Sequence, residues 1–441
     1  MNPRCANHQR WLIIILSAYL VVGALYAVFT PTWQVPDEPA HYNYVRALAE
    51  GRGLPVIELG DYEQDLLGEL TSRDFPPELS VESLEYEDHQ PPLYYLLATP
   101  VYWLFEGAVL PLRLFSVLLG AGVLLVAFKI IRVIFPTRPR LALWTAAFIA
   151  VIPQHLAMMS GVQNDALAEL VVGATLWALL IYVDYGDDVD RDSPRPWPIG
   201  LLLAAALLTK TTAYSLIGLA IITAIVRWRR EKRALPWIAK QLAWTLAPAI
   251  LITAPWFVRN GLTYGWTDPT GIARHNAIVE GQPRSSQWLA LYGWGGLLFR
   301  LARTTFQSFW GQFGWMQVVL PGRFYRALAL LSATLPVGFV WWIFDPRRER
   351  LTSRQRISLL LLAVWTAFVV LSFLGYNLLF VQHQGRYLYP ALVPAGLVAA
   401  LGLEQWAQLL PRRVRPAAIG AFFAGMLLFD LYCLFLMRPY L

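Results

Sequence analysis

Charged residues are scarce in this sequence of 441 residues. Asp, Glu, Lys and Arg together make up 15% of it, whereas hydrophobic residues make up 57%. A soluble protein would carry about a quarter charged residues. The mean hydropathy is +0.46, and apolar runs long enough to cross a bilayer recur along the chain. The composition therefore predicts an all-α polytopic membrane protein.

Cysteine is almost absent. The two cysteines, Cys5 and Cys433, lie near opposite ends of the chain, so the sequence indicates neither a disulfide framework nor a cysteine metal site. It also lacks a zinc motif, a glycine-rich phosphate loop and a nucleophile elbow. Nucleotide-dependent chemistry is not indicated.

Lysine is rare as well, with only four in the chain. The formal net charge of +7 comes mainly from arginines in short loops between apolar runs. Basic loops of this kind mark the cytoplasmic side of a membrane protein. The charge therefore reports orientation, and a nucleic-acid partner is not expected.

The apolar runs predict a bundle of about 11 transmembrane helices, with a cytoplasmic N-terminus and an external C-terminus. Clusters of arginine and lysine at 129–140 and 227–233, and of arginine at 347–356 and 412–415, set this orientation. The first run is interpreted as a retained span because no cleavage site for a signal peptide follows it. The predicted spans are 11–29, 111–133, 141–157, 166–183, 198–208, 213–226, 238–258, 327–344, 357–375, 388–410 and 417–436.

We divide the chain into a transmembrane domain, 1–410, and a C-terminal part, 411–441, with a cytoplasmic loop and the last span. Two long external segments interrupt the domain, at 30–109 and 259–323. Loops of this length require internal structure. Within the first loop, the aromatic run 92–105 is too short for a span, so we expect a juxtamembrane or re-entrant helix there.

The most distinctive motif, Pro36-Asp37-Glu38-Pro39-Ala40-His41, follows the first span. Its prolines restrict the backbone, and Pro39 suits the first turn of a helix. Asp37 and His41 would then lie one turn apart on one face. Two interpretations remain open: the carboxylates of Asp37 and Glu38 carry out chemistry, or Asp37 caps the helix and Glu38 complements its dipole.

Further polar residues fall on the same predicted face of the membrane. Lys210 is the only lysine on that face; it either binds an anionic ligand or extends from a helix end toward the headgroups. Arg386 could bind a phosphate in bidentate fashion or form an ion pair with a carboxylate. Asp165 could be a metal ligand, a second acid or part of an ordinary helix cap. The other members are His41, His89, Asn164, His275, Glu280, His383 and Tyr387.

These motifs together resemble the GT-C superfamily of membrane glycosyltransferases. The likeness is greatest to the branch of protein mannosyltransferases and aminoarabinose transferases, and to related bacterial membrane proteins without an assigned substrate. It covers about residues 10–400. The motifs that carry it are the acidic segment 36–41, His89-Gln90-Pro91-Pro92-Leu93-Tyr94-Tyr95, Asn164-Asp165, Thr209-Lys210 and Gly385-Arg386-Tyr387-Leu388-Tyr389-Pro390.

The resemblance implies specific roles. Asp37 would be the catalytic base with Glu38 as its neighbour, and Asp165 would be the second acidic position. Lys210 and Arg386 would hold a lipid-linked phosphate, and His41, His89 and Tyr387 would bind substrate. The Pro-Pro motif would begin a juxtamembrane helix. A sequon-reading motif and a soluble C-terminal domain were not found, which disfavours en bloc transfer to asparagine.

We therefore expect an inverting glycosyltransferase in the cell membrane. It would move a sugar from a polyprenyl-phosphate donor to a glycan, lipid or protein acceptor on the external face. No cofactor is certain, although a divalent metal ion at Asp165 is possible; the surrounding membrane lipids are also partners. The alternative is a transporter or flippase for a lipid-linked glycan or another amphipathic substrate, which also needs polar groups within its spans.

Overall fold

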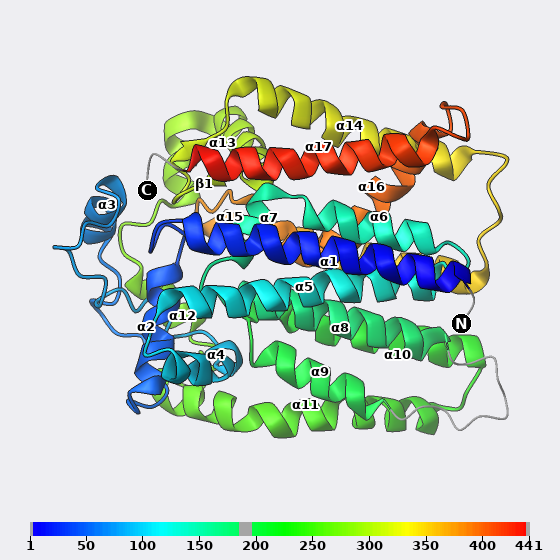
Figure 1. The fold of residues 1–441 in the computed structure, drawn as a ribbon. Helices are drawn as coiled ribbons and strands as arrows, with labels where there is room; N and C mark the ends of the chain where they lie inside the picture. Colours follow the sequence, from blue (N-terminus) through cyan, green and yellow to red (C-terminus); the bar gives the residue numbers. More distant parts are fainter. Residues whose placement is uncertain (1–2, 185–195, 438–441) are drawn as a thin grey trace.

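Long helices that run side by side form the body of the protein (Figure 1). The computed structural model describes residues 3–184 and 196–437. In the first half the helices are α1 (Pro3–Phe29), α2 (Glu38–Ala49), α3 (Gln64–Ser72), α4 (Leu93–Leu104), α5 (Val109–Ile134), α6 (Pro139–Ala150), α7 (Pro153–Met159), α8 (Asp165–Asp184) and α9 (Trp197–Leu207).

The second half adds further helices and one small hairpin. These elements are η2 (Thr211–Ser215), α10 (Leu216–Glu231), α11 (Leu235–Tyr264), α12 (Ile272–Ile278), α13 (Ser285–Trp310), β1 (Gln312–Phe313), β2 (Val318–Val319), α14 (Gly322–Phe344), α15 (Ser353–Leu379), η3 (Gly385–Ala391), α16 (Leu392–Ala407) and α17 (Arg415–Leu436).

Within the described residues, nine helices are long and apolar enough to cross a membrane. The bent pair α6 and α7 would make a tenth crossing. Helix α9 is the eleventh apolar segment, but its 11 residues extend about 16 Å, roughly half of a bilayer core. The prediction of a multi-pass helical bundle is confirmed. The 11 segments expected from the sequence correspond to these nine helices, the bent pair and α9.

One predicted span, 141–157, is broken in the structure. Helices α6 and α7 meet at 71°, and Ile152 between them has an extended backbone with φ −96° and ψ 109°. Pro153 explains this break, because a proline disfavours helical geometry in the residue before it. The sequence prediction treated this run as one straight segment and overlooked the proline.

Short helices gather at one end of the bundle, where α2, α3, α4 and α12 lie together (Figure 1). Helix α4 corresponds to the short helix expected over 92–105. Residues of α2, α3 and α12, with the loops beside them, form a second, smaller core, separate from that of the bundle, which includes Leu70, Leu84, Ile278 and Phe380. The buried residues of α4 belong to the core of the bundle. Within the segment 259–323, helix α13 runs from Ser285 to Trp310 with a kink at Gly293; the sequence indicated only interfacial aromatic residues there.

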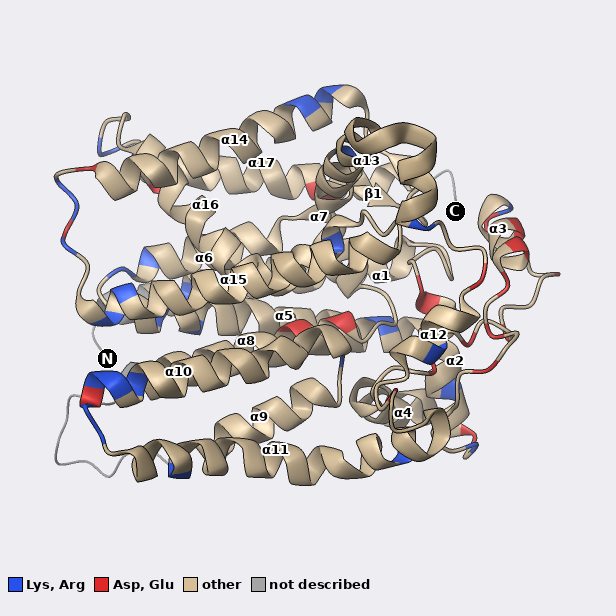
Figure 2. Ribbon diagram, turned by 180° about the vertical axis from the view of Figure 1, so that it is seen from behind, with Lys and Arg blue, Asp and Glu red and all other residues tan. Residues whose placement is uncertain are grey.

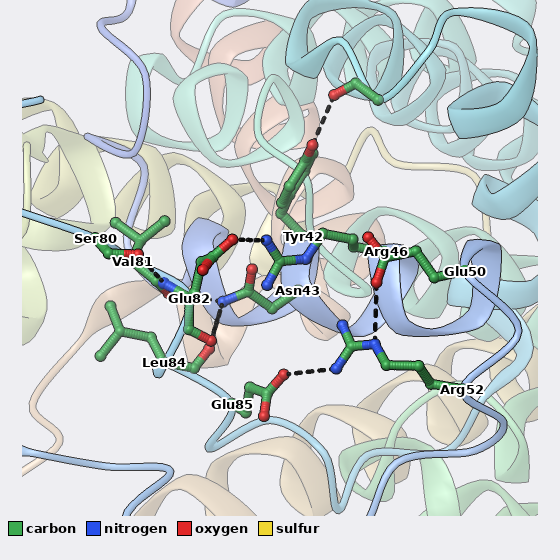
Figure 3. Close-up of polar contacts among 11 residues, drawn as sticks. Tyr42, Asn43, Arg46, Glu50, Arg52, Ser80, Val81, Glu82, Leu84 and Glu85 are labelled. Carbon is green, nitrogen blue, oxygen red and sulfur yellow. Dashed lines mark hydrogen bonds and ion pairs between the residues drawn. The ribbon is translucent and has the colours of Figure 1, made fainter.

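Helix α2 is fixed to the first loop by its polar face (Figure 3). Asn43 donates Nδ2 to the carbonyl oxygens of Val81 at 2.7 Å and Leu84 at 3.0 Å. One turn later, Arg46 forms an ion pair with Glu82 at 2.6 Å. These contacts hold the loop before the Pro-Pro motif against the helix that carries Asp37 at its start.

Charge is distributed unevenly between the two ends of the bundle. Figure 2 shows many basic residues at the end that holds the N-terminus, whereas most acidic residues lie in the loops at the opposite end. This polarity agrees with the arginine pattern from which orientation was predicted. The acidic motif at 36–41 belongs to the end rich in carboxylates.

Candidate functional site

Asp37 stands at the start of α2 in an unusual backbone conformation. Its φ of 67° lies in the left-handed region, which is uncommon for residues other than glycine and is best tolerated by Asn and Asp. Its side chain makes no capping hydrogen bond to α2. Instead, Oδ1 accepts a hydrogen bond from the Tyr86 hydroxyl at 3.0 Å, and Oδ2 accepts one from Arg386 Nη2 at 2.5 Å. The capping interpretation therefore does not describe this carboxylate.

Opposing influences set the acidity of Asp37. Burial raises the pKa of its carboxyl, but the charge and hydrogen bond of Arg386 oppose this, together with His41 and the Tyr86 hydroxyl. The net result is a pKa below the ordinary aspartate value. Asp37 is therefore ionised at neutral pH, and while Arg386 holds it, it is a weak base.

A second ion pair involves the predicted lysine. Lys210 Nζ lies 2.6 Å from Asp165 Oδ1 and 3.1 Å from Asn164 Oδ1. Lys210 immediately precedes η2, shortly after the half-length helix α9, and Asp165 is the first residue of α8. The side chain of Lys210 is 12% exposed, so it does not extend freely toward a lipid headgroup. Each of the two cations singled out in the sequence thus faces a carboxylate.

A cavity of about 400 Å³ connects these groups. It brings together six of the eight predicted site residues, namely Asp37, His41, His89, Lys210, Arg386 and Tyr387. Glu38 and Asp165 are not among its lining residues, although Asp165 reaches it through Lys210. Apolar and aromatic side chains of α15, including Phe373 and Tyr376, form part of the wall. Such a mixture of apolar surface and a few convergent polar groups is typical of ligand sites.

The histidines of the cavity are neutral at pH 7. Burial lowers the pKa of His41, His89 and His275 below the ordinary histidine value. His41 Nδ1 lies 2.8 Å from the Tyr95 hydroxyl, and the rings of His89 and His275 are 4.3 Å apart. A neutral imidazole has one donor and one acceptor nitrogen, so these rings are able to orient hydroxyl groups.

Glu38 has a different environment from its neighbour. Its carboxylate forms a bidentate ion pair with Arg113 of α5, with distances of 2.7 and 2.6 Å. Their side chains are 0% and 3% exposed. The Glu38 carboxylate also accepts hydrogen bonds from the backbone N–H groups of Trp33 and Val162, each at 3.1 Å. All of its hydrogen-bonding capacity is used within the protein, which favours a positioning role for Glu38; the catalytic role expected from the sequence stays a prediction.

The structure adds Glu87 to the site, which sequence reasoning did not single out. Glu87 lines the cavity, and its Oε2 atom is buried without a hydrogen-bond partner among the described residues. Burial raises the pKa of this carboxyl. Its position two residues before His89 was the available signal, but the many other acids between Glu58 and Asp88 concealed it.

Metal binding finds little support in the arrangement of donors. Within residues 3–184 and 196–437, no three His, Cys, Asp or Glu side chains form a group that could hold a metal ion. Asp165, the candidate metal ligand, is paired with Lys210, and Asp37 is paired with Arg386. These carboxylates already face positive charge, so we derive no step through a metal.

Two of the remaining candidates lie outside the cavity. Glu280 is exposed after α12. His383 is buried, with its ring 5.5 Å from that of Trp288. Neither is among the lining residues. The predicted convergence on one face thus includes residues that do not share the site.

The fold is that of the GT-C membrane glycosyltransferases. ArnT from Cupriavidus metallidurans, solved with bound undecaprenyl phosphate, matches with a TM-score of 0.54 at 15% identity, over 98% of this chain and 74% of ArnT. The oligosaccharyltransferase of Archaeoglobus fulgidus, solved with a tethered acceptor peptide, matches with a TM-score of 0.51 at 13% identity.

The second match covers 98% of this chain but only 55% of the oligosaccharyltransferase. By sequence, the chain belongs to the DUF2142 family of predicted membrane proteins, whose family model matches residues 86–394. Among curated proteins, none matches this chain. At these identities the solved structures establish the fold alone.

Proposed function

We propose that this protein transfers a sugar from a polyprenyl-phosphate donor to a hydroxyl-bearing acceptor on the external face of the membrane. The observation that carries this proposal is the convergence of Asp37, Arg386 and Lys210 on one cavity. A base and two cations are the groups required to deprotonate an acceptor and to stabilise a departing phosphate. The similar fold of ArnT, solved with bound undecaprenyl phosphate, supports a lipid phosphate as the carrier.

In the reaction, the acceptor oxygen attacks the anomeric carbon as the bond between that carbon and the phosphate oxygen breaks. The bonding electrons leave on the lipid phosphate, and the acceptor proton passes to Asp37. Direct displacement inverts the anomeric centre. The phosphate is a good leaving group, so no general acid is needed. Its growing negative charge falls between Arg386 and Lys210.

The pairing of Asp37 with Arg386 suggests how the base is activated. Arg386 Nε is buried and without a partner among the described residues, so the guanidinium retains an unused donor for a phosphate oxygen. A phosphate at Arg386 would compete with Asp37 for the same positive charge. The pKa of Asp37 would then rise toward its ordinary value, which makes the carboxylate a stronger base as the donor binds.

The remaining cavity residues would bind the sugar. His41, His89 and Glu87 offer hydrogen-bonding atoms, and Tyr376 and Tyr387 offer aromatic faces, with ring centroids 5.9 Å apart. Buried polar groups without partners are costly unless a ligand satisfies them. The unpartnered oxygen of Glu87 therefore suits a hydroxyl donor on the sugar.

Transfer of radiolabelled sugar from a panel of polyprenyl-phosphate sugars tests the proposal in membranes that contain the protein. We expect turnover by the wild type with at least one donor, and a loss of at least about 100-fold in Asp37→Asn, because a positioned base contributes roughly that much or more. Asparagine tolerates the left-handed backbone of residue 37, so the variant should fold.

Asp65→Asn is the matched control, because Asp65 is an exposed acid on α3 and should leave turnover unchanged. A parallel assay with a chelator should also leave it unchanged. Wild-type activity in Asp37→Asn would exclude Asp37 as the base. No turnover by the wild type with any donor would reject glycosyl transfer in favour of the transporter alternative.

A further inference from the structure

A second and larger cavity, of about 740 Å³, lies at the opposite end of the bundle from Asp37. It is formed where four candidate spans end: after α5 at Ile134, after α14 at Phe344, before α15 at Ser353 and after α16 at Ala407. Cavities of this size accept small-molecule ligands. Because its walls are the ends of membrane helices, it lies at the depth of lipid headgroups.

Arginines dominate the lining of this cavity. Five of them, Arg138, Arg347, Arg348, Arg350 and Arg354, line it together with three carboxylates. Two of these carboxylates are engaged within the protein: Glu404 pairs with Arg138, and Asp345 accepts hydrogen bonds from Gln405 Nε2 at 2.9 Å and the Arg347 backbone at 2.9 Å. The third, Glu349, is exposed.

Two arginines remain available for a ligand. Among the residues that the structure describes, neither Arg348 nor Arg350 has a carboxylate partner. The guanidinium of Arg348 lies 4.6 Å from the ring centroid of Trp342, a contact that positions it while leaving its N–H donors free. Guanidinium groups match phosphate oxygens in bidentate geometry.

We propose that this cavity binds the phosphate headgroup of an anionic phospholipid, with Arg348 and Arg350 as its principal contacts. Basic pockets between transmembrane helices are suited to such headgroups. The apolar residues Val133, Ile134 and Leu351 in the same lining would contact the glycerol and the first acyl carbons. This site is independent of the glycosyl-transfer proposal, because it shares no residue with the cavity of Asp37.

The test titrates lipid into the purified full-length protein in detergent and follows thermal unfolding by tryptophan fluorescence. Dioleoyl phosphatidylglycerol is compared with dioleoyl phosphatidylcholine and with soluble glycerol 3-phosphate. We expect phosphatidylglycerol alone to raise the melting temperature. In the double variant Arg348→Gln/Arg350→Gln, its apparent affinity should fall roughly 30-fold, because each basic residue near a membrane surface contributes about 5-fold.

The double variant Arg412→Gln/Arg413→Gln is the matched control. These arginines are exposed at the same end of the bundle, after α16, and do not line the cavity. Unchanged affinity in this control supports the site. Three results would overturn it: no preference for phosphatidylglycerol, an equal loss in the control, or equally tight binding of glycerol 3-phosphate, which would indicate a soluble phosphate ligand.

Discussion

Asp37 and Glu38 are neighbours in the chain but have opposite environments. The side chain of Asp37 is 21% exposed and lines a cavity, whereas Glu38 is fully buried against Arg113. Arg113 also donates to the carbonyl oxygens of Ala27 at 3.0 Å and Thr30 at 2.6 Å. It therefore links the end of α1, the helix α5 and the start of α2. We infer that Glu38 positions Asp37 by fixing the backbone beside it.

The first prediction concerns this buried pair. Glu38→Gln should lower the free energy of unfolding by about 3–5 kcal/mol, because it leaves the Arg113 charge buried without its partner. Thermal or denaturant unfolding of the purified variant measures this loss. Asp37→Asn is the comparison: its site contains water-accessible surface, so it should lose activity with a much smaller loss of stability.

The opposite pattern would contradict the assignment. A Glu38→Gln protein as stable as the wild type but without transferase activity would return Glu38 to a direct catalytic role. A strongly destabilised Asp37→Asn would show that the pair with Arg386 is primarily structural.

The sequence identified most residues of the candidate site but not the partners of these residues. Asp37, Lys210 and Arg386 were recognisable because charged groups are costly at membrane boundaries. Their pairing was not, because Asp37 and Arg386 are separated by 349 positions, and no local pattern encodes such a contact. The partner of Glu38 was unpredictable for the same reason, because Arg113 lies within the apolar run of α5.

At the scale of elements, the contact between η3 and α13 determines where Arg386 lies. Gly385 N donates to Ser308 Oγ at 2.8 Å, and the Tyr389 hydroxyl donates to the carbonyl oxygen of Phe309 at 2.9 Å. A Cβ atom on Gly385 would lie 2.5 Å from Phe309 Cα and 2.5 Å from Thr305 O. Glycine is therefore required here for close approach of two backbones.

The second prediction follows from that approach. Gly385→Ala should push η3 away from α13, lower the free energy of unfolding by about 1–3 kcal/mol and displace Arg386 from Asp37. Transferase activity and the melting temperature should both fall. Gly375→Ala in α15 is the control, because a Cβ there meets no atom within 4 Å; an equal effect of both variants would exclude this contact as the cause.

Long apolar helices could be predicted from the sequence, whereas helices of mixed composition could not. The spans that became α5, α14, α15 and α17 each follow from one uninterrupted apolar run. Helix α13 was not predicted, because its 26 residues mix arginine, glycine and tryptophan and it fails the criteria for a membrane span. Helix α13 packs against η3, α15 and α7. A periodic pattern of hydrophobic residues in the sequence does not reveal such tertiary contacts.

At the scale of the whole molecule, the two cavities occupy opposite ends of one bundle. The cavity of Asp37 lies with the acidic loops, and the arginine-lined cavity lies at the end where α14 passes into α15. Basic loops favour the cytoplasmic side. We therefore expect the acidic end to face outward.

The third prediction tests this orientation with two matched serine substitutions. Ser72 on α3 and Ser353 at the start of α15 are both exposed. Helix α3 lies at the end of the acidic loops (Figure 1), whereas Ser353 stands between Thr352 and Arg354, which line the arginine-lined cavity at the other end. In a Cys5→Ser background, Ser72→Cys should react with a membrane-impermeant maleimide in intact cells, and Ser353→Cys only after permeabilisation. Cys433 is fully buried and should not react. The reverse labelling pattern would place the candidate site on the cytoplasmic face.

The contact between Arg386 and Asp37 also has a kinetic consequence. Under the proposed mechanism, the empty enzyme holds its base in an unreactive state, and only a donor that supplies a phosphate to Arg386 releases it. Substrates would then bind in a compulsory order, with the lipid-linked sugar before the acceptor. An acceptor or a water molecule that enters first meets a carboxylate too weakly basic to deprotonate it.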